Sequence, residues 1–285
     1  MRGLIARMTT IEGLNFLLTN RIPRRLATRA VGWLSHIEKP WVAKPAMAIW
    51  RIFSDVDLSD AATDDFPSMH ACFTRSLRPG ARTFEGGAGV LSSPSDAILG
   101  AHGMIAGDEA HQIKGAPYRL SELLGDECEA AALDGGRYAT LRLTAGMYHR
   151  FHAPQDLVVE QVRYLSGDCW NVNTPVLKRV ERLFCRNERA VIRCRLPDGS
   201  ALILVAVAAV LVASIRLTFL DTPTLLRDGG ERTIPLHVAI DRGAEMGWFE
   251  HGSTIIVLTD TQWRVFADDG SRLKAGEPLM TLARE

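Results

Sequence analysis

A glycine–serine pair near the C-terminus is the first candidate for chemistry. Gly252 and Ser253 stand directly before the run from Thr254 to Leu258, whose β-branched residues predict a strand. Glycine leaves its own carbonyl unhindered, and a serine hydroxyl next to a carbonyl can attack it. Most Gly-Ser-Thr triplets are ordinary turns before a strand, so the pair indicates chemistry only together with other residues.

Candidate acid and base groups occur in two further stretches. Asp96 follows Ser93-Pro94-Ser95, and the proline holds its carboxylate on a rigid loop. His149 and His152 lie three residues apart in a segment that ends at a proline. Considered singly, Asp96 is a turn residue, and the two histidines are a hydrogen-bonded pair or metal ligands. The metal interpretation is weak, because zinc-binding helices place histidines four apart beside a glutamate. No metal is therefore expected.

The composition is that of an ordinary globular protein. Its 285 residues are 47% hydrophobic and 23% charged, enough for one large domain or two small ones. Lysine and arginine (33) balance aspartate and glutamate (33), so the overall charge does not indicate nucleic acid as a partner. Five cysteines without a CxxC pair favour reduced thiols of a cytoplasmic protein. No signal peptide is expected, and the apolar run 201–215 is shorter than the roughly 20 residues of a membrane-spanning helix.

The first 50 residues differ from the rest of the chain. They hold eight lysines and arginines against two acidic residues, a net charge of +6 that the remaining 235 residues offset with −6. Apolar residues recur at helical spacing in 4–18 and 26–37, and three of the six tryptophans lie in this arm. This pattern predicts amphipathic helices lying on an anionic membrane surface. The alternative is a pair of helices packed on the protein's own core.

The remainder of the chain predicts a β-rich body. An acidic link (57–65) precedes a short helix within 66–82 that ends at a Pro-Gly turn. From Leu91 onward, short apolar runs alternate with Gly/Asp turns at 134–136, 197–199, 228–230 and 268–270, which is typical of antiparallel sheets. The expected fold class is therefore α+β. Residues 1–65 are expected to form an amphipathic helical membrane-association region, and residues 66–285 an antiparallel β-rich catalytic domain.

Several short motifs follow one another in an order that identifies a family. They are Cys72-Phe73-Thr74-Arg75 with Pro79-Gly80-Ala81-Arg82, Ser93-Pro94-Ser95-Asp96, Gln112-Ile113-Lys114-Gly115 with Tyr118 and Leu120, Tyr148-His149-Arg150-Phe151-His152-Ala153-Pro154, Val172-Asn173, Asn187-Glu188-Arg189, the run 205–215, and Gly252-Ser253-Thr254. Together they resemble the phosphatidylserine decarboxylase family, the pyruvoyl-dependent membrane enzymes. The resemblance covers nearly the whole chain, and its specificity comes from the shared order.

The resemblance implies self-processing. Asp96 would orient His152, His152 would remove the hydroxyl proton of Ser253, and the hydroxyl would attack the Gly252 carbonyl. Elimination would then split the backbone into a β subunit (1–252) and an α subunit (253–285), and hydrolysis of the residue left at the new N-terminus would release ammonia and give a pyruvoyl group. Both subunits would come from one zymogen chain, and a dimer of these units is left open.

The resemblance also implies a carboxy-lyase reaction in phospholipid biosynthesis. The pyruvoyl group derived from Ser253 would be the cofactor, forming a Schiff base with phosphatidylserine and accepting electrons as CO2 leaves to give phosphatidylethanolamine. His152 is the first candidate for proton donor to the α-carbon. His149 would hold the substrate carboxylate or share the proton transfer. The implied location is the cytoplasmic face of the cell membrane, bound peripherally.

Two rival functions follow from the same residues. One is a related pyruvoyl decarboxylase of another amine, such as an aromatic amino acid, although a soluble substrate gives no reason for the basic arm. The other is a lipid-binding homologue that is never processed, against which the intact Asp96, His152 and Ser253 argue.

Overall fold

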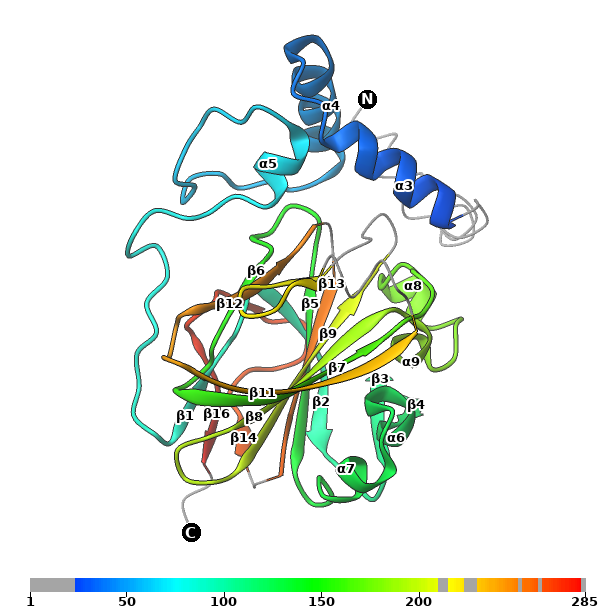
Figure 1. The fold of residues 1–285 in the computed structure, drawn as a ribbon, viewed down its shortest axis with the longest axis vertical. Helices are drawn as coiled ribbons and strands as arrows, with labels where there is room; N and C mark the ends of the chain where they lie inside the picture. Colours follow the sequence, from blue (N-terminus) through cyan, green and yellow to red (C-terminus); the bar gives the residue numbers. More distant parts are fainter. Residues whose placement is uncertain (1–23, 210–214, 223–229, 251–252, 261–262, 283–285) are drawn as a thin grey trace.

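A computed structural model describes residues 24–209, 215–222, 230–250, 253–260 and 263–282 of the chain (Figure 1). Its body is built around an eight-stranded sheet in which every neighbouring pair is antiparallel. In spatial order, the strands are β11 (Glu231–Ile240), β7 (Leu157–Leu165), β8 (Arg189–Arg195), β9 (Ala201–Ala208), β13 (Ser253–Thr259), β5 (Arg137–Leu143), β2 (Ala97–Met104) and β15 (Arg272–Leu273). The α+β class predicted from the turn spacing is confirmed.

Both faces of this sheet are covered, and this explains why its central strand is buried at every position. Alternate residues of a strand point to opposite faces. In β13, Ile255 and Val257 accordingly enter one core cluster, while Ile256 and Leu258 enter another. The expected strand after Gly252-Ser253 is therefore present, buried on both sides.

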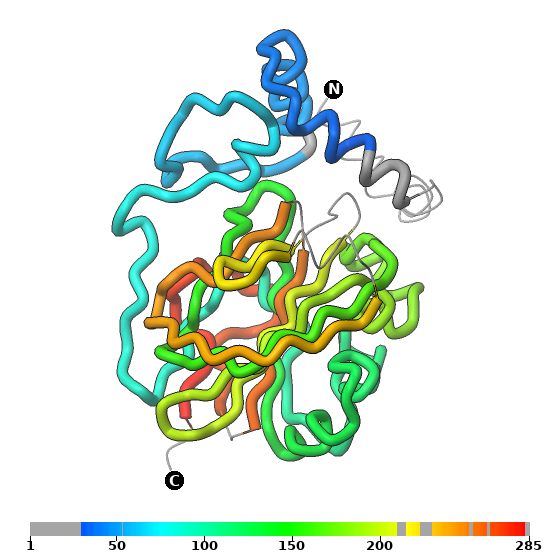
Figure 2. The backbone as a smooth tube through the Cα atoms, viewed as in Figure 1, coloured from blue at the N-terminus to red at the C-terminus, as the bar shows by residue number. Residues whose placement is uncertain are grey.

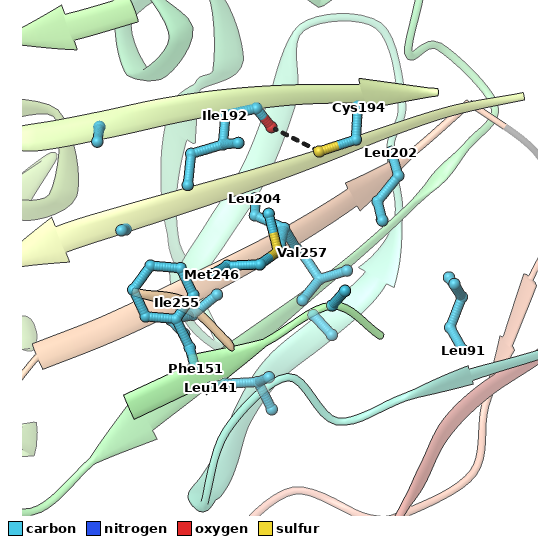
Figure 3. Packing of buried hydrophobic residues seen from close by; sticks show 14 of the residues in the cluster. Leu91, Leu141, Phe151, Ile192, Cys194, Leu202, Leu204, Met246, Ile255 and Val257 are labelled. Atoms are coloured by element: carbon cyan, nitrogen blue, oxygen red, sulfur yellow. Dashed lines mark hydrogen bonds between the residues drawn. The ribbon is translucent and has the colours of Figure 1, made fainter. Parts of the chain in front are cut away.

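Two small sheets close the first face. One consists of β1 (Val90–Ser92), β16 (Pro278–Leu282) and β14 (Trp263–Val265), and the other of β10 (Ile215–Leu217), β12 (Glu245–Phe249) and β6 (Arg150–His152). Figure 3 shows how their residues Leu91, Phe151 and Met246 pack with residues of the large sheet. This packing fixes β6, which ends at His152, and its partner β12 against the sheet that carries Ser253.

Short helices and a hairpin cover the second face. They are the hairpin β3 (Glu109–Ile113) and β4 (Ala116–Arg119), followed by α6 (Leu120–Leu124), α7 (Glu127–Ala131), α8 (Thr174–Leu177) and α9 (Leu183–Arg186). They contribute Leu123, Val176 and Phe184 to the second core cluster. The glycines of the predicted turns, Gly135, Gly199, Gly230 and Gly270, all have positive φ, which glycine adopts without steric cost. Residues 228 and 229 of one turn lie outside the described residues.

Three helices lie beyond one end of the body: α3 (Arg24–Ser35), α4 (Pro40–Phe53) and α5 (Met69–Phe73). The segment between α5 and β1 then runs along the body to its opposite end (Figure 2). Helix α3 contains most of the predicted amphipathic segment 26–37, whereas the segment 4–18 lies outside the described residues. No helix in the described part of the chain is long and apolar enough to cross a bilayer. Because α5 packs with α3 and α4, the domain boundary at residue 65 stays a prediction.

Candidate active site

Ser253 lies at the point where the central strand of the sheet begins. It stands opposite Leu143 of β5 on one side and Ala208 of β9 on the other. Its side chain is fully buried, and its Oγ has no hydrogen-bond partner among the described residues. A buried hydroxyl without a partner costs about 1–3 kcal/mol, so Ser253 is a position where packing alone does not explain a serine. Gly252 lies outside the described residues.

His149 is fully buried beside the strand that leads toward Ser253. Its backbone carbonyl accepts a hydrogen bond from the N–H of Phe249, the last residue of β12 (3.0 Å). The ring Nδ1 donates to the Met147 carbonyl (2.8 Å). A carbonyl only accepts, so in the neutral ring Nδ1 carries the proton and Nε2 the lone pair. The ring also packs against Phe73 of α5, with centroids 3.9 Å apart, which places His149 between the body and the N-terminal helices.

His152, the last residue of β6, is held by both ring nitrogens. Nδ1 donates to the Gly243 carbonyl (2.8 Å), and Nε2 accepts from the hydroxyl of Tyr148 (2.9 Å). Burial lowers the pKa of His152, opposed in part by the Gly243 carbonyl, and burial raises the pKa of Tyr148. Both effects favour a neutral imidazole hydrogen-bonded to a neutral phenol. A neutral imidazole with its lone pair on Nε2 has the protonation state of a general base.

Asp96 is held by an arginine. Arg82 donates two hydrogen bonds to it, Nε to Oδ1 (2.8 Å) and Nη2 to Oδ2 (2.6 Å), and the Ala275 N–H adds a third (2.9 Å). Such a two-point pair fixes both the position and the plane of the carboxylate. Arg82 and the Ala275 N–H therefore hold the Asp96 carboxylate in one orientation.

The direct hydrogen bond between Asp96 and His152 that the predicted relay requires is not formed in this structure. The Gly243 carbonyl occupies the Nδ1 side of the imidazole instead. The two segments are nevertheless neighbours, because the His152 backbone N–H donates to the Pro94 carbonyl (2.8 Å). The negative charge of Asp96 also opposes the lowering of the His152 pKa. Asp96 thus influences the imidazole through space, and its role as the orienting acid stays a prediction.

A cavity of about 490 Å³ lies between the N-terminal helices and the end of the sheet at which Ser253 begins. The helix side contributes mainly apolar residues, among them Trp50, Met69 and Phe73. The body side includes Leu143, one strand partner of Ser253, and Ala209, which follows the other partner, Ala208. Its lining there consists of Arg142, Leu143, Thr144, Ala145, Asn171, Val172, Asn173 and Ala209. A cavity with one mainly apolar wall and one wall of mixed polarity suits a ligand that is itself amphiphilic.

Comparison with known proteins places this geometry in a family. The family model described as "Phosphatidylserine decarboxylase" matches residues 69–281. A phosphatidylserine decarboxylase proenzyme of Anaeromyxobacter sp. is 35% identical over 273 residues, covering 90% of this chain and 94% of the relative. That of Alcanivorax borkumensis is 34% identical over 245 residues, covering 83% and 84%.

The chain belongs to the phosphatidylserine decarboxylase family. The resemblance inferred from the ordered motifs is therefore confirmed. The segment matched to the phosphatidylserine decarboxylase family contains Asp96, His149, His152 and Ser253. Their individual roles, and the cleavage point at Gly252, stay predictions.

Three hydrogen-bond partners of these residues were not predicted from the sequence. Tyr148 hydrogen-bonds His152, Gly243 fixes its tautomer, and Arg82 holds Asp96. Tyr148 and Arg82 belong to motifs that carried the resemblance, so their positions were the available signal. Gly243 acts through its carbonyl, which every residue type has, and only its positive φ of 79° marks a turn there.

Proposed function

We propose that this protein is a self-processing phosphatidylserine decarboxylase that cleaves its own chain between Gly252 and Ser253. The observation that carries the proposal is the fully buried Ser253 hydroxyl, which starts a central strand without a hydrogen-bond partner in the described part of the chain. The relatives are named phosphatidylserine decarboxylase proenzymes, which supports a precursor that matures by cleavage. The aromatic amino acid alternative has no such support.

The protein's own residues supply the groups that processing needs. Ser253 Oγ is the nucleophile, and the carbonyl of Gly252 is its target. His152, neutral and with its lone pair on Nε2, is the base, and the hydroxyl of Tyr148 occupies the proton-accepting position in the resting state. Asp96 stabilises the imidazolium through its charge once the proton has moved. The ester formed at Ser253 then breaks by elimination, which leaves the α subunit with its new N-terminus at the edge of the cavity.

A pyruvoyl group derived from Ser253 fits this position, because Leu143 and Ala208 enclose the strand end and the serine is shielded from water. Such a group supplies a carbonyl that accepts electrons when CO2 leaves the substrate. His149 packs against Phe73, which lines the cavity. We assign to His149 the transfer of a proton to the α-carbon or the positioning of the substrate carboxylate. The apolar helix wall of the cavity excludes water from the reacting centre.

We further propose that α3 and α4 hold the protein on the cytoplasmic face of a membrane. The exposed fractions of Trp33, Trp41 and Ile49 are 72%, 78% and 56%, and the first 50 residues carry a net charge of +6. Exposed tryptophans on a basic helical segment support insertion at the lipid–water interface. The cavity beneath these helices would then receive its lipid substrate directly from the bilayer.

Vesicle binding tests this location. Trp33→Ser and Trp41→Ser are each expected to weaken binding to vesicles containing phosphatidylserine by roughly fivefold or more, because each removes apolar area from the interface. Deleting residues 1–38, which removes α3 and leaves α4, is expected to weaken vesicle binding while self-cleavage continues. Sedimentation with vesicles at low and high salt measures both effects, since exposed charges are screened over about 10 Å at 0.1 M salt.

Phe266→Ser is the matched control, because Phe266 is also 65% exposed but lies on the β body. It should bind vesicles as the unmodified protein does. Equal loss of binding in the Phe266 variant, or full binding by the protein lacking residues 1–38, would contradict a membrane role for the N-terminal helices.

A further inference from the structure

Arg142 is the one charged residue among the described residues that line the large cavity. It belongs to β5, and its side chain is half-buried. Its Nη1 donates one hydrogen bond, to the hydroxyl of Thr174 at the start of α8 (2.9 Å). No carboxylate of the described residues pairs with it. Burial lowers the pKa of Arg142, and no neighbouring acidic group opposes this.

The arginines of the body that are more deeply buried than Arg142 or similarly buried are satisfied in one of two ways. Arg82, Arg150 and Arg163 each form an ion pair with a carboxylate. Arg75 and Arg189 direct their guanidinium groups at three or more backbone carbonyls. Arg142 has neither arrangement, and a guanidinium carries five N–H donors. Even a half-buried cation gains from an anion or several acceptors that compensate its lost hydration, so the position suits an anionic group from outside the chain.

Arg142 also lies close to the reactive position. It stands opposite Thr254 in the pairing of β5 with β13, and its neighbour Leu143 stands opposite Ser253. Because alternate residues of a strand point to opposite faces, the side chains of Arg142 and Ser253 leave the sheet on opposite faces. Arg142 and Leu143, the strand partner of Ser253, nevertheless both line the cavity at the end of the sheet. In a phosphoserine headgroup, one methylene and one oxygen separate the phosphorus from the amine-bearing carbon. An anchor for the phosphate must therefore lie within one side-chain length of the reacting carbon.

We propose that Arg142, oriented by Thr174, forms the subsite that binds the phosphodiester of the substrate headgroup. The apolar helix wall of the same cavity, with Trp50 and Phe73, takes the glycerol end of the lipid. This proposal rests on the proposed decarboxylase function and deepens it, because it names the residue that selects a phosphorylated substrate over a free amino acid.

The phosphate, and not the departing carboxylate, is the anion that suits this position. An arginine paired with the carboxylate would stabilise the bound substrate more than the transition state, since the negative charge leaves that group as CO2 forms. The phosphodiester keeps its charge throughout the reaction, so an arginine paired with it stabilises substrate and transition state equally. Uniform binding of this kind lowers KM and leaves kcat unchanged.

The test compares Arg142→Gln and Arg142→Lys with the unmodified protein. Self-cleavage on a denaturing gel reports folding, and CO2 release from phosphatidylserine in mixed micelles gives kcat and KM. Arg142→Gln is expected to cleave normally and to raise KM by about tenfold or more, with kcat changed less than about threefold, because a charge-assisted hydrogen-bond pair is lost. The KM of Arg142→Lys should lie between that of the unmodified protein and that of Arg142→Gln, since a lysine keeps the charge but not the planar donor pair. Arg264→Gln, at an exposed position on β14, should match the unmodified protein.

Calorimetric titration with glycerophosphoethanolamine tests the proposed phosphate subsite without relying on turnover. The unmodified protein should bind this probe, Arg142→Gln should bind it about tenfold more weakly, and inorganic phosphate should bind far more weakly than the probe. An unchanged KM and unchanged probe binding in Arg142→Gln would overturn the phosphate subsite, as would a fall in kcat at constant KM. Equal binding of inorganic phosphate would replace the headgroup subsite by a simple phosphate site. If the unmodified protein releases no CO2, the decarboxylase function fails, and the titration still decides the role of Arg142.

Discussion

Replacing Ser253 by alanine is expected to leave one full-length chain without decarboxylase activity. The substitution removes the only atom at this position that can attack the Gly252 carbonyl, and it removes the source of the pyruvoyl group. Because the Ser253 hydroxyl makes no hydrogen bond within the described residues, its loss should not destabilise the fold. The expected result is therefore a folded, uncleaved and inactive protein, read from a denaturing gel, a thermal unfolding curve and CO2 release.

Ser92→Ala is a matched control for this experiment. Ser92 is also fully buried in β1, and its hydroxyl likewise has no partner among the described residues. This variant should cleave and turn over normally. Cleavage of Ser253→Ala at the same place would contradict the assigned nucleophile.

Alanine variants of the two histidines are expected to be blocked at different steps, one at self-cleavage and the other at decarboxylation. His152→Ala should remain uncleaved, since it removes the base of processing and with it every later step. His149→Ala should cleave and form the pyruvoyl group, yet turn over about 10²–10⁴-fold more slowly, the usual cost of losing one positioned acid or base. The contacts support this division, because His152 lies beside the Pro94 loop and Gly243, whereas His149 packs on Phe73 at the cavity.

A gel separates the two variants before any assay is run. His111→Ala is the control, since His111 is partly exposed on β3 and pairs only with Glu109 within the described residues. If His149→Ala stays whole while His152→Ala cleaves, the roles of the two imidazoles are reversed.

Individual strands and turns of the fold could be predicted from local sequence patterns, whereas the pairing of the strands could not. The β-branched run after Ser253 predicted β13 correctly, and the Gly/Asp turns predicted a β-rich body. The neighbours of β13 could not be predicted. They are β5 (Arg137–Leu143) and β9 (Ala201–Ala208), both of which lie far from β13 in the sequence and pair with it only in the folded chain. Strand pairing depends on which faces become buried, which single-strand patterns do not encode.

The same holds for the site, where the candidate residues could be predicted from the sequence but the groups that contact them could not. The sequence motifs identified Asp96, His149, His152 and Ser253 as the candidate groups, and the structure places Asp96 near His152 and His149 near the end of β12. The arginine that holds Asp96 comes from the long segment between α5 and β1, and the carbonyl that holds His152 comes from a turn 91 residues away. These contacts depend on the folded path of the backbone. The role of Asp96 in orienting His152 stays a prediction, because in this structure the Gly243 carbonyl is the hydrogen-bond partner of the imidazole Nδ1.

Intact mass spectrometry of the purified, unmodified protein tests the central claim most directly. Formation of a pyruvoyl group adds one water and releases one ammonia, whereas ordinary hydrolysis of the same bond adds a water and keeps the nitrogen. The account predicts two chains, residues 1–252 with a free carboxylate and residues 253–285 with a blocked N-terminus, whose summed mass shows the loss of ammonia. A single chain of full mass, or two chains in which residue 253 is still serine, would contradict it.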